Sequence, residues 1–175
     1  MEKEFPAFRV CEIVGINQNQ LTTWLARGHI KASTPAEGSG TRNIFTVQDI
    51  FRIEMFKRLS KKTSRSRAAL VAFPQKRTEA TKRMNTAISK AVKGVIKHRA
   101  DIDDTDKTIL AKAPKPDPLY IAAYEYPEGL MVSILQSSHE FSKLYQLMRG
   151  QIDFQIINLT KIAERILDKI AENKG

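Results

Sequence analysis

A proline-rich stretch near the middle of the chain limits what the sequence can fold into. Residues 111–118 read AKAPKPDP, and the acidic run ADIDDTD occupies residues 100–106. Proline fixes φ and removes a backbone donor, so this stretch is expected to be extended and to interrupt helices and sheets. We therefore predict a domain at 1–70, a connecting or dimerisation helix at 71–99, a linker at 100–118, and an α+β oligomerisation or effector domain at 119–175.

Positive charge is concentrated before this linker. The first 99 residues hold 20 Lys and Arg against 7 Asp and Glu, whereas residues 100–175 hold 9 against 12, within a net charge of +10. This asymmetry favours a front half that binds a polyanion and a back half with another role. A lysine-rich surface that serves only solubility is the alternative interpretation.

The first 28 residues predict two helices joined by a tight turn. A short helix fits 7–14, Gly15 permits the turn, Asn17 is the N-cap of a helix at about 18–27, and Gly28 takes the left-handed position after it. One apolar stripe of the second helix is expected to be buried, and it comprises Leu21, Trp24 and Leu25.

Two short strands and further helices are expected next. HIKAS at 29–33 and RNIFT at 42–46 read as strands around the turn TPAEGSGT. Thr46 and Asp49 form a capping-box-like helix start. Residues 66–97 are mostly helical in pattern, with a kink or restart at Pro74.

The back half predicts a ββαβα order with a small antiparallel sheet. Its strands are LYIAAYEY and LMVSILQ, joined by PEG, and later IDFQII. SSHE is a capping box that opens a helix to about Met148, and NLTKIAERILDKIAEN is an amphipathic helix. The fold class predicted for the whole chain is mainly α, α+β.

The N-terminal pattern resembles a known family. VCEIVGINQNQLTTWLARGHIKAS, followed by TRNIFTVQDIFRIEMFKRL, is similar to the DNA-binding domain of the MerR family of bacterial regulators, over about residues 7–70. The matching features are Gly15-Ile16, Trp24, Gly28-His29-Ile30, Arg42 with Phe45, and Asp49-Ile50. The resemblance implies a winged helix-turn-helix. Thr22 stands where the family has an arginine that contacts phosphate.

The residue types of the second helix also point to duplex DNA. Gln and Asn can bond adenine bidentately, and Thr can bond a base edge or pack on a thymine methyl. Surrounding cations would attract phosphates, and we name Arg9, Arg27, Lys31, Arg42, Arg52, Lys57 and Arg58 for this role. The predicted DNA-binding residues are Gln18, Asn19, Gln20, Thr22, Thr23, Arg27, Lys31, Ser39, Thr41, Arg42, Asn43 and Arg52. A merely solvated helix face is the alternative.

A second group of cations lies between the linker and the first domain. Its spacing suggests that it wraps around the long helix, which favours a solubilising role over an extended phosphate track. The group comprises Lys76, Arg77, Lys82, Arg83, Lys90, Lys93 and Lys97.

The sequence offers little for catalysis. Its three histidines are scattered and no glycine-rich phosphate loop is present, so we predict no enzyme, no cofactor and no metal site. Cys11 is expected to be a small core residue. No signal peptide or membrane span is apparent, which predicts a cytoplasmic protein without a membrane partner.

Three functions stay open at this point. The first is a bacterial or prophage transcriptional regulator, a homodimer whose small-molecule effector is uncertain. The second is a phage or mobile-element DNA protein, such as an excisionase or a small terminase subunit. The third is a basic scaffold protein that binds an acidic partner.

Overall fold

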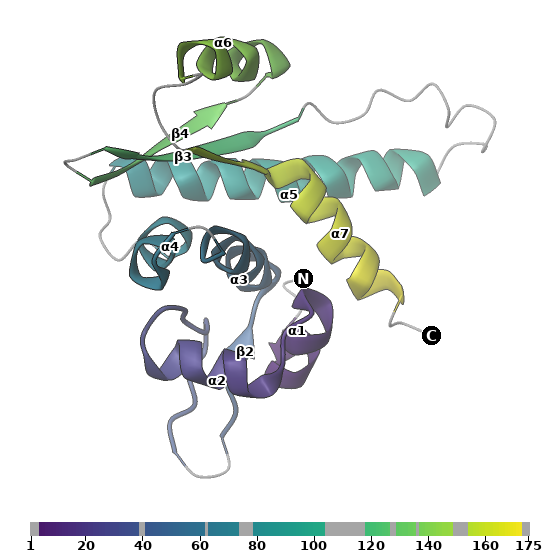
Figure 1. The fold of residues 1–175 in the computed structure, drawn as a ribbon. Helices are drawn as coiled ribbons and strands as arrows, with labels where there is room; N and C mark the ends of the chain where they lie inside the picture. Colours follow the sequence, from purple (N-terminus) through teal and green to yellow (C-terminus); the bar gives the residue numbers. More distant parts are fainter. Residues whose placement is uncertain are drawn as a thin grey trace. The chain divides into compact units, whose positions relative to one another are not determined.

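The computed structural model describes residues 4–38, 41–61, 63–73, 79–103, 118–126, 129–135, 137–148 and 154–172. These residues are mainly helical with two small antiparallel sheets, in agreement with the predicted class (Figure 1). The chain divides into two compact units. The first holds Met1–Thr81 with Arg165–Gly175, and the second holds Lys82–Glu164.

The first two helices of the first unit confirm the sequence prediction. Helix α1 spans Ala7–Val14 and ends at Gly15, whose φ of 68° is left-handed. Helix α2 spans Gln18–Ala26, and Asn17 caps its N-terminus. Gly28 has a φ of 65°, so the chain leaves α2 through a conformation that side chains with a Cβ disfavour.

The small sheet of this unit differs from the predicted hairpin. Strand β2 (Ile44–Phe45) pairs antiparallel with β1 (Phe5–Pro6), while residues 29–33 form no strand. Only one bridge joins Thr34 to Ile44. Thr34 and Ile44 exchange both of their backbone hydrogen bonds, but the N–H of Ala36, the next in register, bonds to the side chain of Asn43 instead.

Helices α3 (Val47–Leu59) and α4 (Arg65–Ala72) complete the N-terminal segment. Thr46 and Asp49 form the predicted capping box of α3, and the hydroxyl of Ser64 accepts from the N–H of Arg67 at the start of α4. Helix α4 ends before Pro74, which lies outside the described residues.

A compact apolar core joins these elements. Trp24 of α2 meets Phe56 of α3 edge to face, with ring centroids 4.9 Å apart. Leu21 and Trp24 are buried as predicted, whereas Leu25 is only half-buried. Cys11 is buried in α1, also as predicted. This core holds α2 from one side only, so its other side faces solvent.

The second unit confirms the ββαβα order. Its elements are β3 (Tyr120–Tyr126), β4 (Gly129–Leu135), α6 (Ser138–Met148), β5 (Phe154–Asn158) and α7 (Leu159–Glu172), of which residues 165–172 belong to the first unit. The sheet is antiparallel in the order β4-β3-β5, with Ile121 opposite both Ile134 and Ile157. Ser137 accepts from the N–H of Glu140, as the SSHE motif predicted.

Helix α5 spans Glu79–Asp103, so it continues four residues past the predicted end at residue 99. Residues 100–103, predicted as linker, continue the helix, while residues 104–117 lie outside the described part. Within the second unit, Figure 1 places α5 and α6 on opposite sides of the sheet. Over residues 87–95 the apolar side of α5 is buried within the single chain, so this part of α5 does not need a second subunit to cover it. That side comprises Ala87, Ile88, Ala91, Val92 and Val95.

Candidate nucleic-acid interface

The outward side of α2 carries polar but uncharged side chains. Asn19, Thr22 and Thr23 are exposed and stand at helical spacing i, i+3 and i+4, so they share one face. We call these three residues the α2 stripe. Leu21 and Trp24, on the opposite face, retain only 1% and 6% of their accessible surface. The stripe is therefore presented on a helix that is fixed from behind.

The two glutamines of α2 differ in what their side chains do. Gln18 is exposed at the first helical position. The Gln20 side chain instead closes the capping box: its Oε1 accepts from the N–H of Asn17 at 3.1 Å. In return, Asn17 Oδ1 accepts from the N–H of Gln20 at 2.8 Å. The acceptor oxygen of Gln20 stabilises the helix start, so the predicted contact of Gln20 with a base would use its amide NH2 group.

The segment between α2 and β2 has two exposed cations and a loop held by its own polar groups. Lys31 and Arg42 are exposed. Thr41 donates from its hydroxyl to the carbonyl of Gly38 at 2.8 Å, and Asn43 Oδ1 accepts from the N–H of Ala36 at 3.0 Å. Thr41 and Asn43 thus shape the loop, which leaves Lys31 and Arg42 as its contacts for an anion. Ser39 lies outside the described residues.

Acidic neighbours engage several of the predicted phosphate contacts. Arg9 pairs with Glu12 at 2.6 Å. Arg58 Nε donates to Glu54 at 2.7 Å.

Arg52 is half-buried and its Nε is removed from solvent, which makes it a poorer phosphate contact than predicted. Glu37 is also exposed on the 31–43 segment and opposes anion binding there. Among the exposed cations named above, Arg27 directly follows α2, and Lys31 and Arg42 lie in the segment between α2 and β2.

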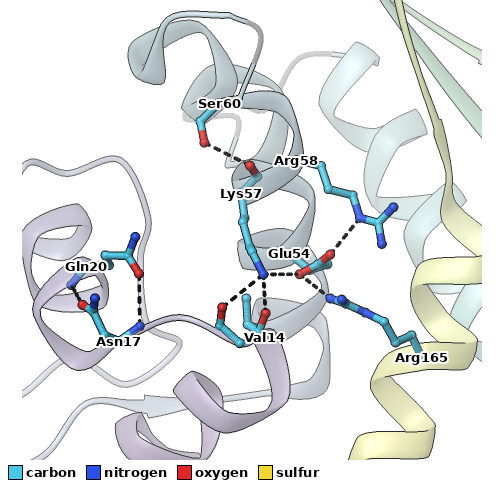
Figure 2. A network of polar contacts seen from close by, with 9 residues as sticks. Val14, Asn17, Gln20, Glu54, Lys57, Arg58, Ser60 and Arg165 are labelled. Carbon is cyan, nitrogen blue, oxygen red and sulfur yellow. Dashed lines mark hydrogen bonds and ion pairs between the residues drawn. The ribbon is translucent and has the colours of Figure 1, made fainter.

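Glu54 is the centre of a charge cluster that the sequence prediction missed. Its side chain is 2% exposed and lies among three cations: Arg58, Lys57 and Arg165, the last of which belongs to the first unit (Figure 2). Arg165 Nη2 stands 2.5 Å from Glu54 Oε2 as an ion pair, although the atoms lack hydrogen-bond alignment. A buried carboxylate needs such partners, because desolvating an unpaired charge is costly.

Lys57 connects this cluster to the turn in front of α2. Its Nζ donates to the carbonyl of Val14 at 2.6 Å and to that of Gly15 at 3.2 Å (Figure 2). Burial lowers the pKa of the Lys57 ammonium below its usual value, and the carboxylate of Glu54 acts in the opposite direction. Lys57 was predicted to contact phosphate, but the structure uses it to hold the last carbonyls of α1 and the turn.

The sequence did contain a signal for the Glu54 cluster. Glu54 interrupts an otherwise apolar run on α3 and is followed by cations three and four residues later, a spacing that brings side chains together on a helix. Asp49 is the second buried acid of α3, and its carboxylate accepts from Ser33 and from the N–H of Thr46. The carboxylates of both acids therefore bind groups that surround α3 within the protein.

The remaining chemistry of the described residues is sparse. They contain no group of three or more His, Cys, Asp or Glu side chains close enough to hold a metal ion. None of their helices combines the length and apolarity needed to cross a bilayer. Comparison of the chain with protein-family models and with curated proteins gives no match.

Proposed function

We propose that this chain is a sequence-specific double-stranded-DNA-binding protein, with α2 as the recognition helix of a MerR-like winged helix-turn-helix. The observation that carries the proposal is the α2 stripe: three uncharged hydrogen-bonding side chains on the exposed face of a helix that is packed from behind. A helix that enters the major groove needs side chains that read base edges, and Asn and Thr serve that purpose.

The exposed cations complete the proposed interface. Arg27 follows α2, and Lys31 and Arg42 lie in the segment that would form the wing. Cations at the rim of a recognition helix contact phosphates or the minor groove, which fixes the helix on the duplex without reading sequence. Base contacts and phosphate contacts are therefore assigned to different residues.

The experiment that tests the proposal is selection of bound sequences from a random duplex pool. Sequence-specific binding enriches a short motif, and its affinity falls steeply between low and moderate salt. Binding without enrichment would remove the recognition role of α2. An absence of duplex binding at low salt would favour the basic scaffold that binds an acidic partner.

Single substitutions then separate the two kinds of contact. Asn19→Ala is expected to reduce discrimination by about 1–3 kcal/mol at one or two base pairs. Arg42→Ala is expected to weaken binding to all duplexes alike. Ser66→Ala, an exposed substitution on α4, is the matched control and is expected to change neither. Equal motifs and equal affinities for Asn19→Ala and the control would contradict the assignment.

The biological setting we propose is that of a bacterial or prophage transcriptional regulator that acts as a homodimer. A phage DNA protein, such as an excisionase or small terminase subunit, uses the same interface in the alternative setting. Two half-sites one helical turn apart in the selected motif would indicate a dimer. Protection of an operator at the protein's own promoter would indicate a regulator, and a larger ring at a packaging site would indicate a terminase subunit.

A further inference from the structure

The exposed face of α5 within the second unit is basic. Among the side chains that the structure describes over residues 82–95, the exposed ones are Lys82, Arg83, Thr86, Lys90 and Lys93. The sequence of this stretch, KRMNTAISKAVKGV, contains no Asp or Glu. The exposed face therefore presents four cations and one hydroxyl, and we call these five residues the α5 basic face.

Helical geometry places these residues together. At about 100° per residue, the five positions cover only about 100° of the helix circumference. The buried side chains Ala87, Ala91 and Val95, with Ile88 and Val92, occupy the opposite side. The cations within the described part of α5 therefore do not wrap around the helix, which corrects the spacing argument for a purely solubilising role. Of the group predicted from the sequence, Lys76 and Arg77 lie outside the described residues.

The composition of the face argues for a polyanionic ligand. Like charges that share one side of a helix repel one another, and Lys90 and Lys93 stand at i and i+3. Mixed charges would provide solubility without that repulsion. Lys82, Arg83 and Lys90 also interact with other groups of the chain, so the argument rests on their charge and position and not on their being unpaired.

The face fits a nucleic-acid backbone better than a membrane surface. None of its five side chains is apolar, and the apolar side chains described over residues 87–95 are buried in the chain and so cannot insert among lipid chains. Lys82 and Lys93 are about 16 Å apart along the axis at 1.5 Å per residue. Duplex DNA presents on the order of ten phosphates over that length.

We infer that the α5 basic face is a second DNA-binding surface, which contacts the phosphate backbone of a duplex without reading its sequence. The inference rests on the proposed function in taking duplex DNA as the ligand. It assigns to the second unit an electrostatic contribution that is separate from base recognition by the α2 stripe. The face extends the protein's footprint on DNA and adds to its salt dependence.

The test compares two charge-matched double variants of the full chain. Lys90→Gln with Lys93→Gln removes two positive charges from the α5 basic face. Lys143→Gln with Lys161→Gln removes two from exposed positions elsewhere in the second unit. Affinity for the selected duplex and for an unrelated duplex is measured as a function of salt. Urea unfolding of each variant verifies that it folds.

The expected result is a loss confined to the α5 variant. Removing two phosphate contacts lowers the magnitude of the salt slope by about 1.8, because each contact contributes about 0.9. Affinity for both duplexes falls by roughly the same factor, about tenfold or more at low salt, and the selected motif is unchanged. The control double variant keeps the wild-type slope within about 0.5.

Other outcomes overturn the inference. Equal slope losses in the two double variants would mean that only the general field of the protein attracts DNA. An unchanged slope in the α5 variant would mean that its lysines make no phosphate contact. Loss of binding to anionic phospholipid vesicles, with duplex binding intact, would assign the face to a membrane. Failure of the proposed function has a different signature: no motif is enriched by the wild-type protein, whatever its salt slope.

Discussion

Replacing Lys57 by methionine tests how the helix that carries the α2 stripe is positioned. Methionine keeps most of the aliphatic stem of lysine and removes the ammonium group. The wild-type ammonium lies 2.6 Å from the carbonyl oxygen of Val14, 3.2 Å from that of Gly15 and 3.9 Å from a carboxylate oxygen of Glu54. The substitution therefore removes two hydrogen bonds at the α1–α2 turn and one ion-pair partner of a buried acid.

The structure sets the size of the expected loss. The last carbonyls of α1 have no partner within the helix, so Lys57 satisfies groups that would otherwise depend on water. A hydrogen bond from a charged donor contributes about 1.5–3 kcal/mol, and a neutral one about 1 kcal/mol. Burial lowers the pKa of Lys57, which shows that desolvation offsets part of the benefit of its charge. We therefore take about 1 kcal/mol for each hydrogen bond and expect Lys57→Met to lower the free energy of unfolding by about 2 kcal/mol.

The assay is urea unfolding followed by the fluorescence of Trp24. Trp24 is the only tryptophan of the chain and packs against Phe56, so its signal reports the unit that contains Lys57. Lys61→Met is the matched control, because Lys61 is exposed just after α3, and we expect it to change stability by less than about 0.5 kcal/mol. If both variants unfold at the same urea concentration, the contacts of Lys57 do not hold the turn, and the reasoning is refuted.

Two further predictions concern other positions of the first unit. Gly28→Ala is expected to cost about 1–2 kcal/mol, because the φ of 65° disfavours a Cβ even though the added atom would meet no neighbour within 4 Å; unfolding at the wild-type urea midpoint would contradict this. Burial, with a smaller effect of the Glu12 carboxylate, raises the pKa of the Cys11 thiol. The folded state therefore keeps its thiol proton at a pH where the unfolded chain releases it, so the free energy of unfolding falls as pH rises above the ordinary thiol pKa. Urea titrations at pH 8 and pH 10 should show a smaller fall in Cys11→Ala than in the wild-type protein, and equal falls would count against the prediction.

Elements that depend on neighbouring residues were predictable from the sequence. Asn17, Thr46 and Ser137 precede helices at positions where their side chains accept from backbone N–H groups two or three residues later, and each does so in the structure. Gly15 and Gly28 mark the ends of α1 and α2 for an equally local reason. The strands of the second unit are long enough for their apolar and β-branched residues to form a pattern that identifies them in the sequence.

Elements that depend on distant residues were not predictable. Strands β1 and β2 have two residues each, too few for a periodic pattern, and their pairing joins positions that are 38 and 40 residues apart. The sequence pattern instead predicted that residues 42–46 pair with the nearer segment 29–33. The ion pair of Arg165 with Glu54 joins positions that are still farther apart in the sequence. No rule based on neighbouring residues predicts such a pair.

The candidate site shows why residue type alone overstates a binding surface. Asn19 and Gln20 are adjacent, exposed amides of the same residue chemistry, yet the acceptor oxygen of Gln20 already serves the helix cap. The cations also differ in what they are already bound to. The carboxylates of Glu12 and Glu54 pair with Arg9, Lys57 and Arg58.

Formal charge therefore overstates the attraction that the first 99 residues exert on DNA. Paired cations are already partly neutralised and release fewer counterions from a duplex than exposed ones. Two groups of exposed cations bear on the proposed interface, Arg27, Lys31 and Arg42 after α2, and those of the α5 basic face; Arg58, Lys61, Arg65 and Arg67 are exposed elsewhere in the first unit. Each group belongs to a different compact unit. If both groups contact the backbone, the salt slope of the wild-type protein exceeds what the three cations after α2 can supply, which is about 2.7 at 0.9 per contact. A slope at or below that value would leave no phosphate contact to the α5 basic face. A larger slope that falls when Lys90 and Lys93 are replaced by Gln would assign the excess to that face and not to the other exposed cations of the first unit.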